Sequence, residues 1–168
     1  MTSSPILVVM GVSGAGKTTV GEAIAARLGW AFVDGDDLQP EANLAKMAGG
    51  QPLTDADRAP WLAAIGAWID AQARASEPGV VACSALKRAY RDALRRGRPQ
   101  VRIVYLHGSQ AEIAERLAHR AGHFWPAKLL ASQFADLEEP TADEEPIVVD
   151  IAETPEALVD AVIAKLSL

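Results

Sequence analysis

A glycine-rich segment that directly follows an apolar run constrains this chain more than any other feature. Residues 11–18 read Gly-Val-Ser-Gly-Ala-Gly-Lys-Thr and match the pattern G-x-x-x-x-G-K-[ST] at every position. The apolar run Pro5–Met10 precedes the segment, and apolar residues follow it at helical spacing at Val20, Ile24 and Leu28. A strand, a glycine loop and a helix in this order predict a loop whose backbone N–H groups hold a polyphosphate at a helix N-terminus.

Each part of this loop has an expected role in binding ATP with Mg²⁺. Lys17 is predicted to bridge the β- and γ-phosphates, Thr18 to give its hydroxyl to Mg²⁺, and Thr19 to reach the α-phosphate. A glycine-rich turn that matches by chance is the alternative, which the flanking strand and helix disfavour. The residues predicted to bind the nucleotide are Gly11, Val12, Ser13, Gly14, Ala15, Gly16, Lys17, Thr18 and Thr19.

Five short runs rich in β-branched residues alternate with helical segments. Most of the runs are continuously apolar, which is typical of strands covered on both faces. They predict an α/β fold, a five-stranded parallel sheet with helices on both faces and ligands at the carboxyl ends of the strands. The 168 residues show no repeat or long linker, so we expect one domain over residues 1–168. The predicted strands are residues 6–9, 31–33, 80–83, 101–106 and 147–149.

Polar residues mark the starts of three predicted helices. A helix is expected to begin near Thr54, with Trp61 and Trp68 on its core-facing side rather than in a binding site. Ser109 and Glu112 fit a capping box, and Thr154 precedes a proline and an acid in the manner of an N-cap.

Composition disfavours a nucleic-acid-binding, membrane-binding or disulfide-bonded protein. The chain has 16 Lys and Arg against 22 Asp and Glu, and the net charge of −6 disfavours non-specific binding to nucleic acid or an anionic membrane. Cys83 is the one cysteine, which excludes an intramolecular disulfide and makes the cytoplasm the expected compartment. The first apolar run is too short to cross a bilayer, and we expect no signal peptide or membrane anchor.

Two acids at the end of the second predicted strand are candidate reaction carboxylates. Asp34 and Asp36 are two residues apart, so in an extended segment their side chains share one side. We expect Asp34 to help hold Mg²⁺ and Asp36 to accept a proton from an attacking hydroxyl. The alternative is that Asp36 or Asp37 caps a helix that runs through Met47.

A concentrated basic segment stands out in this acidic chain. Lys87 and Arg91 are four residues apart and so share a helix face, which Arg95 extends. Because the segment begins where a sheet of this type binds ligands, we favour Lys87 and Arg91 entering a pocket over an exposed basic helix or a nucleic-acid patch. The cations of the segment are Lys87, Arg88, Arg91, Arg95, Arg96 and Arg98.

Two large classes of phosphate-loop protein fit the sequence poorly. A guanine-specific switch reads its base with N-K-x-D, but Asn43, the one asparagine, is followed by Leu44. Motor and transport ATPases are far longer. A compact kinase that phosphorylates a small molecule remains.

Several later segments together resemble the gluconate kinase (gluconokinase) family across essentially the whole chain. The phosphate loop alone does not distinguish families, whereas the order and composition of these segments do. Trp125 stands where the family at times carries Met, a difference expected to alter packing rather than chemistry. The segments are residues 34–36, 43–47, 52–62, 83–92, 122–126 and 129–134.

The resemblance implies a phosphate-loop fold of the nucleotide and shikimate kinase type, which phosphorylates the 6-hydroxyl of D-gluconate with ATP. It implies a substrate-binding segment over about 34–62 and a closing lid over about 116–137. A homodimer is expected on the same basis alone. The alternatives left open are another metabolite kinase, acting on shikimate or a nucleoside monophosphate, and a nucleotide-dependent binding switch.

The resemblance also implies roles for residues of the acceptor site and the lid. Arg116 is expected against the adenine, and Arg120 at the phosphates as a catalytic cation. A pair of surface arginines is the alternative for these two. For the acceptor, Asp36 is expected to take the proton. The remaining residues expected to bind the sugar acid are Arg58, Lys87, Arg91 and His123.

Overall fold

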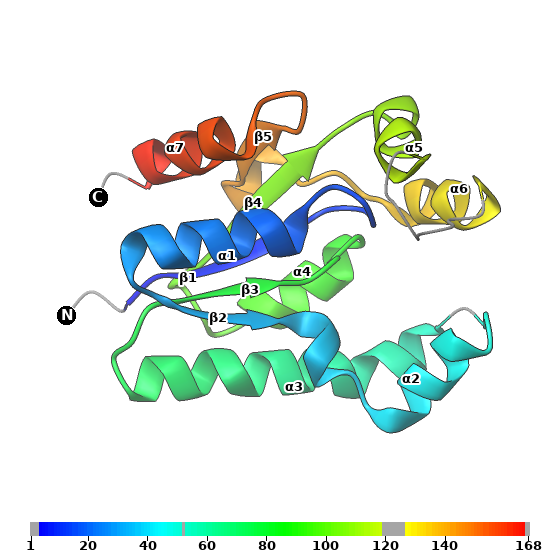
Figure 1. Ribbon diagram of the computed structural model, residues 1–168. Helices are drawn as coiled ribbons and strands as arrows, with labels where there is room; N and C mark the ends of the chain where they lie inside the picture. The colour runs from blue at the N-terminus through cyan, green and yellow to red at the C-terminus, as the bar shows by residue number, and fades with distance from the viewer. Residues whose placement is uncertain (1–3, 52, 119–126, 167–168) are drawn as a thin grey trace.

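The computed structural model describes residues 4–51, 53–118 and 127–166, and its centre is a parallel five-stranded sheet (Figure 1). The strand order is β2-β3-β1-β4-β5, and every neighbouring pair is parallel. The prediction of a five-stranded α/β fold is confirmed, with each strand within two residues of its expected ends. The strands are β1 (Ile6–Met10), β2 (Ala31–Asp34), β3 (Gly79–Ala82), β4 (Val101–His107) and β5 (Ile147–Asp150).

Helices cover both faces of the sheet, and β1 shows why its sequence is continuously apolar. Leu7 and Val9 face one core with α1 and α7, whereas Ile6, Val8 and Met10 face a second core with α3 and α4. Successive side chains of a strand point to opposite faces, so a strand between two helical layers needs apolar residues at every position. The helices are α1 (Lys17–Leu28), α2 (Glu41–Ala48), α3 (Asp55–Arg74), α4 (Arg88–Arg95), α5 (Gln110–Ala118), α6 (Ala127–Asp136) and α7 (Pro155–Lys165).

The three predicted helix starts are confirmed. Thr54 and Asp57 form a capping box at α3, and Ser109 and Glu112 exchange hydrogen bonds at the start of α5. The Thr154 hydroxyl accepts the N–H of Ala157 in α7. Trp61 is 3% exposed and donates its indole N–H to the Gly35 carbonyl at 2.7 Å. The predicted packing role of this tryptophan therefore holds.

The segment after β2 differs from the helix considered in the sequence. A 3-10 turn, η1 (Gly35–Leu38), comes first, and its N-cap is Asp34, which accepts the Asp36 N–H. The helix α2 then begins independently after Pro40. Neither Asp36 nor Asp37 caps α2, because proline and an extended Gln39 interrupt the backbone between them.

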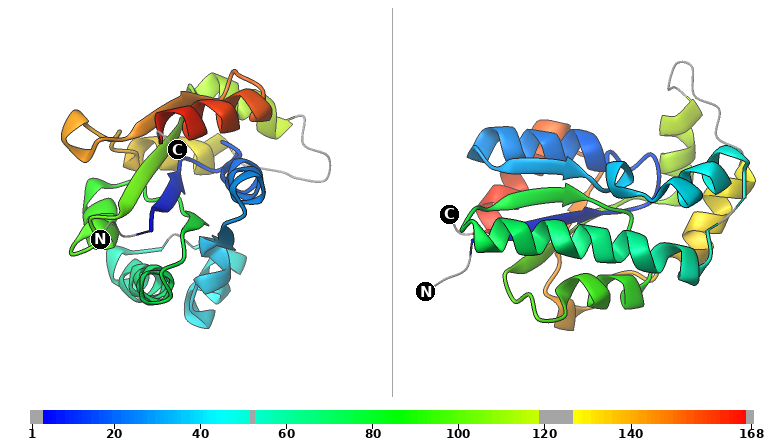
Figure 2. Two further views of the ribbon diagram at one scale, coloured as in Figure 1. Left: turned by 90° about the vertical axis from the view of Figure 1, so that its left-hand side faces the viewer. Right: turned by 90° about the horizontal axis from the view of Figure 1, so that it is seen from below.

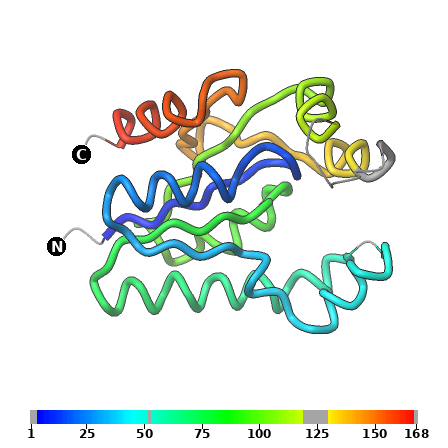
Figure 3. The backbone as a smooth tube through the Cα atoms, viewed as in Figure 1, coloured from blue at the N-terminus to red at the C-terminus, as the bar shows by residue number. Residues whose placement is uncertain are grey.

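The segments that carry the predicted site lie at one end of the molecule. The carboxyl ends of the strands point toward this end (Figure 1), and α2, α5 and α6 extend past the sheet there in the right-hand view of Figure 2 and in Figure 3. A second 3-10 turn, η2 (Ala142–Glu144), precedes β5. None of the helices within the described ranges is long and apolar enough to cross a membrane.

Candidate active site

The glycine-rich loop connects β1 to α1 in a conformation that requires glycine. Gly14 and Gly16 have φ of 86° and 94°, in the left-handed region that side chains disfavour. A Cβ on Gly14 would also lie 2.9 Å from the Leu117 side chain of α5. The loop leads directly into the first turn of α1. The free N–H groups and the positive dipole end of a helix N-terminus suit phosphate oxygens.

Lys17 folds back over this loop from the first position of α1. Its ammonium donates to the carbonyl oxygens of Gly11 at 3.0 Å and Val12 at 3.2 Å. Burial lowers the pKa of Lys17, while the negative charges of Asp36 and Asp34 act in the opposite direction. The Lys17 ammonium is thus a partly desolvated cation that lies beside the N–H groups at the start of α1. Such a cation is well placed to pair with an anionic phosphate.

Asp34 joins the loop to the turn after β2. One carboxylate oxygen accepts the Thr18 hydroxyl at 2.9 Å, and the other accepts the Asp36 N–H at 2.9 Å. The strand predicted to place Asp34 and Asp36 on one side ends at Asp34, so the turn rather than strand periodicity brings the two acids together. Thr18 and Asp34 thus form an oxygen-donor pair at the start of α1.

Asp36 lies between charges of opposite sign. Partial loss of hydration raises the pKa of its carboxyl, the nearby Asp34 carboxylate raises it further, and Lys17 opposes the shift. A carboxylate with a raised pKa is a better proton acceptor near neutral pH than an ordinary aspartate. The environment of Asp36 therefore suits general base chemistry.

A pocket lies on the other side of the loop, between α1, α5 and α7. Arg116 at its edge donates to the Ile151 carbonyl at 2.9 Å and to the Ala15 carbonyl at 3.4 Å. The pocket adjoins the loop at the first turn of α1. It is lined by Gly14, Ala15, Gly16, Thr19, Val20, Arg116, Leu117, Pro155 and Leu158.

Two of the predicted acceptor-site cations meet around one tyrosine. The Arg58 guanidinium carbon and the Lys87 ammonium lie 5.4 Å and 5.8 Å from the centre of the Tyr90 ring. Arg58 also donates to the Tyr90 hydroxyl at 3.0 Å, and that hydroxyl donates to Asp55 at 2.5 Å. Lys87 is the N-cap of α4, after β3, so it lies at the ligand-binding edge of the sheet.

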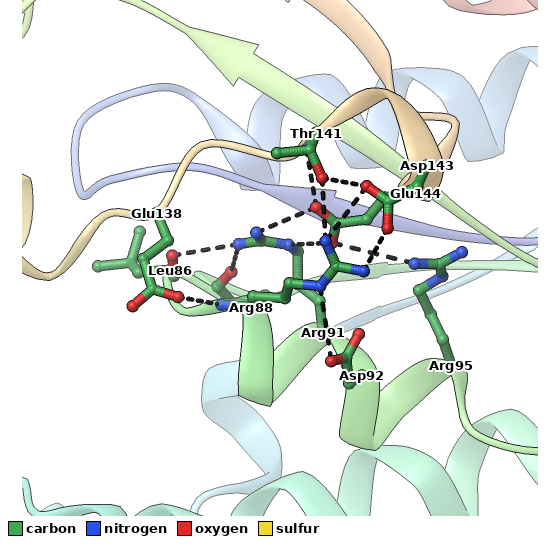
Figure 4. A network of polar contacts seen from close by, with 10 residues as sticks. Leu86, Arg88, Arg91, Asp92, Arg95, Glu138, Thr141, Asp143 and Glu144 are labelled. Atoms are coloured by element: carbon green, nitrogen blue, oxygen red, sulfur yellow. Dashed lines mark hydrogen bonds and ion pairs between the residues drawn. The ribbon is translucent and has the colours of Figure 1, made fainter.

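The structure corrects the prediction for Arg91. Its side chain is 1% exposed, and it donates to the Glu144 carboxylate at 2.7 Å and to the carbonyls of Ala85 and Leu86 (Figure 4). Arg91 lies in the first turns of α4, whose N-cap is Lys87, but its side chain is directed to Glu144 of η2. All three guanidinium nitrogens already have protein partners, so Arg91 braces the fold rather than meeting a ligand.

The rest of the basic segment is also largely neutralised by acids. Arg88 pairs with Asp143 and Asp92, and Arg95 approaches Glu144 at 3.9 Å (Figure 4). Arg98 pairs with Asp70 at 2.8 Å. The run of cations in the sequence therefore mostly fastens α4 to its neighbours.

Sequence reasoning missed three residues that the structure brings to the site. The Gln133 side chain, on α6, accepts the Ser13 N–H of the loop at 2.6 Å and donates to the Ser13 hydroxyl at 2.8 Å. Asp55 and Tyr90 join Arg58 and Lys87. All three lie within segments quoted for the family resemblance, but neither periodicity nor charge pattern separated them from surface residues. Arg120, His123 and Trp125 lie outside the described residues.

Comparison with known proteins extends over most of the chain. A family model described as an AAA domain matches residues 6–140. The gluconokinase of Gluconobacter oxydans (strain 621H) is 55% identical over 142 residues, which cover 84% of this chain and 79% of that protein.

Solved structures agree with this match. The crystal structure of a gluconokinase from Sinorhizobium meliloti 1021 superposes with a TM-score of 0.88 at 48% identity, covering 99% of this chain and 94% of that one. The shikimate kinase of Aquifex aeolicus vf5 reaches a TM-score of 0.65 at 15% identity, covering 96% of each chain, and shares the fold alone.

Proposed function

This chain belongs to the gluconokinase family of phosphate-loop kinases, and we propose from this premise that it transfers the γ-phosphate of ATP to the 6-hydroxyl of D-gluconate. The products are 6-phospho-D-gluconate and ADP. The hydrogen bond between Thr18 and Asp34 carries the proposal, because it joins the phosphate loop to the turn that holds Asp36. Phosphate-binding and acceptor-activating groups therefore meet at one point.

The donor set at Thr18 and Asp34 fits Mg²⁺. This ion prefers oxygen ligands and is usually held by one or two protein groups together with substrate phosphates and water. The Thr18 hydroxyl and the Asp34 carboxylate, 2.9 Å apart, supply such groups. When bound, Mg²⁺ supplies charge neutralisation at the phosphate oxygens.

Phosphoryl transfer places three demands on the protein's own side chains. Lys17 neutralises charge on the transferring group, and Asp36 orients the acceptor hydroxyl and takes its proton. Among the predicted cations, Arg58 and Lys87 are proposed to hold the acceptor carboxylate. Arg116 is proposed to lie against the adenine, and Arg120 and His123 to complete the site.

An acceptor screen tests the proposal. Purified protein with ATP and Mg²⁺ is given gluconate, other sugar acids, shikimate or a nucleoside monophosphate, and ADP release is measured together with the phosphorylated product. We expect release with gluconate and a phosphate ester at its 6-position. Release with shikimate or a nucleotide instead, or slow hydrolysis that no acceptor stimulates, contradicts the proposal.

Two further proposals concern the protein in the cell. We propose a cytoplasmic location, which the lone, buried Cys83 supports because the fold needs no disulfide. We also propose a homodimer, which sedimentation at several concentrations tests directly.

A further inference from the structure

We propose that the Asp55 carboxylate occupies the position that the carboxylate of the acceptor takes when a sugar acid binds. A sugar acid must then displace the Asp55 side chain before it is phosphorylated, which makes Asp55 a specificity-determining residue. The proposal rests on the proposed function and deepens it, because it identifies how one negative charge on the acceptor is recognised.

Three donors converge on a single oxygen of Asp55. Its Oδ1 accepts the Tyr90 hydroxyl at 2.5 Å and lies 3.8 Å from the Lys87 ammonium and 3.9 Å from the Arg58 guanidinium. A hydroxyl and two cations around one position form a site that suits a carboxylate oxygen. In this structure the Oδ1 atom of Asp55 occupies that position.

The side chains of Tyr90, Arg58 and Lys87 are held in place more firmly than the Asp55 carboxylate that they surround. Tyr90 is 8% exposed, and Arg58 and Lys87 pack against its ring. By contrast, the Asp55 side chain is 73% exposed at the first position of α3. The three donors can therefore keep their positions when Asp55 turns out into water.

Asp55 is not needed to begin its helix. Thr54 accepts the Asp57 N–H and Asp57 accepts the Thr54 N–H, which completes the cap without Asp55. The two long distances to the cations also differ from the short contacts of a structural ion pair such as Arg91 with Glu144. Two cations against one carboxylate leave a positive charge that favours an incoming anion.

The cluster is joined to the reacting end of the site. Trp61 lies one helical turn after Arg58 and donates to the carbonyl of Gly35, the residue before Asp36. Lys87 is the N-cap of α4 at the carboxyl edge of β3. A linear polyol acid with its carboxylate on these donors would extend its far end toward the turn that holds Asp36. A neutral polyol gains no ion pair at these cations and therefore binds less tightly than the acid.

The test compares Asp55→Asn with the wild type, with D-gluconate and its uncharged analogue D-gluconamide as acceptors. We expect Asp55→Asn to lower the KM for gluconate about two- to fivefold, because the competing carboxylate has gone, the size of a weak exposed ion pair. The KM for ATP, kcat and the KM for gluconamide should stay within about twofold. Tyr90→Phe, which removes one donor, should raise the KM for gluconate by a similar factor.

The control variant carries its substitution away from the acceptor site. Asp160→Asn removes an exposed carboxylate of α7 that pairs with Arg27, and should change no kinetic constant. Melting curves establish that each variant is folded, and a direct gluconate titration gives Kd if kcat changes. A raised or unchanged KM for gluconate in Asp55→Asn overturns the inference. Absence of gluconate-dependent ADP release in the wild type instead overturns the proposed function.

Discussion

The Gln133 side chain on α6 makes two hydrogen bonds to Ser13 of the phosphate loop, across 120 residues of sequence. Its carbonyl oxygen accepts the Ser13 N–H at 2.6 Å, and its amide donates to the Ser13 hydroxyl at 2.8 Å. Helix α6 is thus fastened to the loop that is proposed to hold ATP.

Changing Gln133 to Glu places a negative charge at this contact and removes the donor to the Ser13 hydroxyl. We expect the KM for ATP to rise by about tenfold, because the new carboxylate repels phosphate oxygens nearby. Gln100→Glu, before β4 at the opposite end of the sheet, adds the same charge and serves as the control. Equal ATP constants in the two variants would show that Gln133 does not face the nucleotide.

Replacing Lys17 with Ala should abolish useful turnover and leave the fold intact. The ammonium bonds to the loop carbonyls in the free protein and is proposed to neutralise charge on the transferring phosphoryl group. Loss of one such group costs at least about a hundredfold in kcat. Steady-state kinetics with a melting curve measure both effects, and near-normal kcat would remove Lys17 from its assigned role.

Asp36→Asn should lower kcat by about 10²- to 10⁴-fold while ATP still binds. Burial and Asp34 raise the pKa of Asp36, so wild-type activity should fall as the pH drops through that raised value, where the carboxyl takes up a proton. The variant should lack this acidic limb. A pH profile of kcat decides the matter, and an unchanged kcat contradicts the base role.

Asp36→Asn, which should lower kcat, should raise the stability of the fold at neutral pH. A carboxyl whose pKa is raised in the folded state contributes stability that is present below its ordinary pKa and is lost as the pH rises through the raised value. At neutral pH the ionised Asp36 therefore destabilises the fold. Asp36→Asn should increase the urea midpoint at pH 7, and a decrease would show that the carboxylate holds the turn.

Arg91→Met should destabilise the protein by about 3–5 kcal/mol, because it removes the cation that is hydrogen-bonded to the buried Glu144. The double variant Arg91→Met, Glu144→Leu should recover much of this loss. Urea unfolding measures both free energies. At a temperature where Arg91→Met is folded, its KM for gluconate should be close to that of the wild type, whereas a large rise would return Arg91 to the acceptor site.

The pKa of Glu144 gives this ion pair a pH dependence. Burial alone would raise the pKa, but hydrogen bonds from Arg91 and from the Thr141 N–H lower it on balance. The stability that Glu144 contributes is therefore present above its ordinary pKa of 4.5 and is lost as the pH falls through the lowered value. Acid unfolding of the wild type should show this loss, and the double variant should not.

Local signals in the sequence were sufficient to predict the fold and the phosphate loop of the candidate site. Continuous apolar strands, capping residues and the glycine loop depend on near neighbours in the chain, and the structure places each of them as expected. Thr18 and Asp34 can pair although β3 lies between β1 and β2, because all strands of a parallel sheet end at the same edge. The turn at Asp36 was missed, since Pro40 separates it from the helix that follows.

The sequence by itself determined that a phosphate loop, two acids and several cations accompany a parallel sheet. Only the tertiary structure decided which cations face the site. Arg91 and Lys87 are four residues apart, yet Arg91 is buried against Glu144, 53 residues away, while Lys87 lies beside Asp55. The cost of burying an unpaired charge fixes the partner of Arg91, and that partner's position depends on how the chain between β4 and β5 packs.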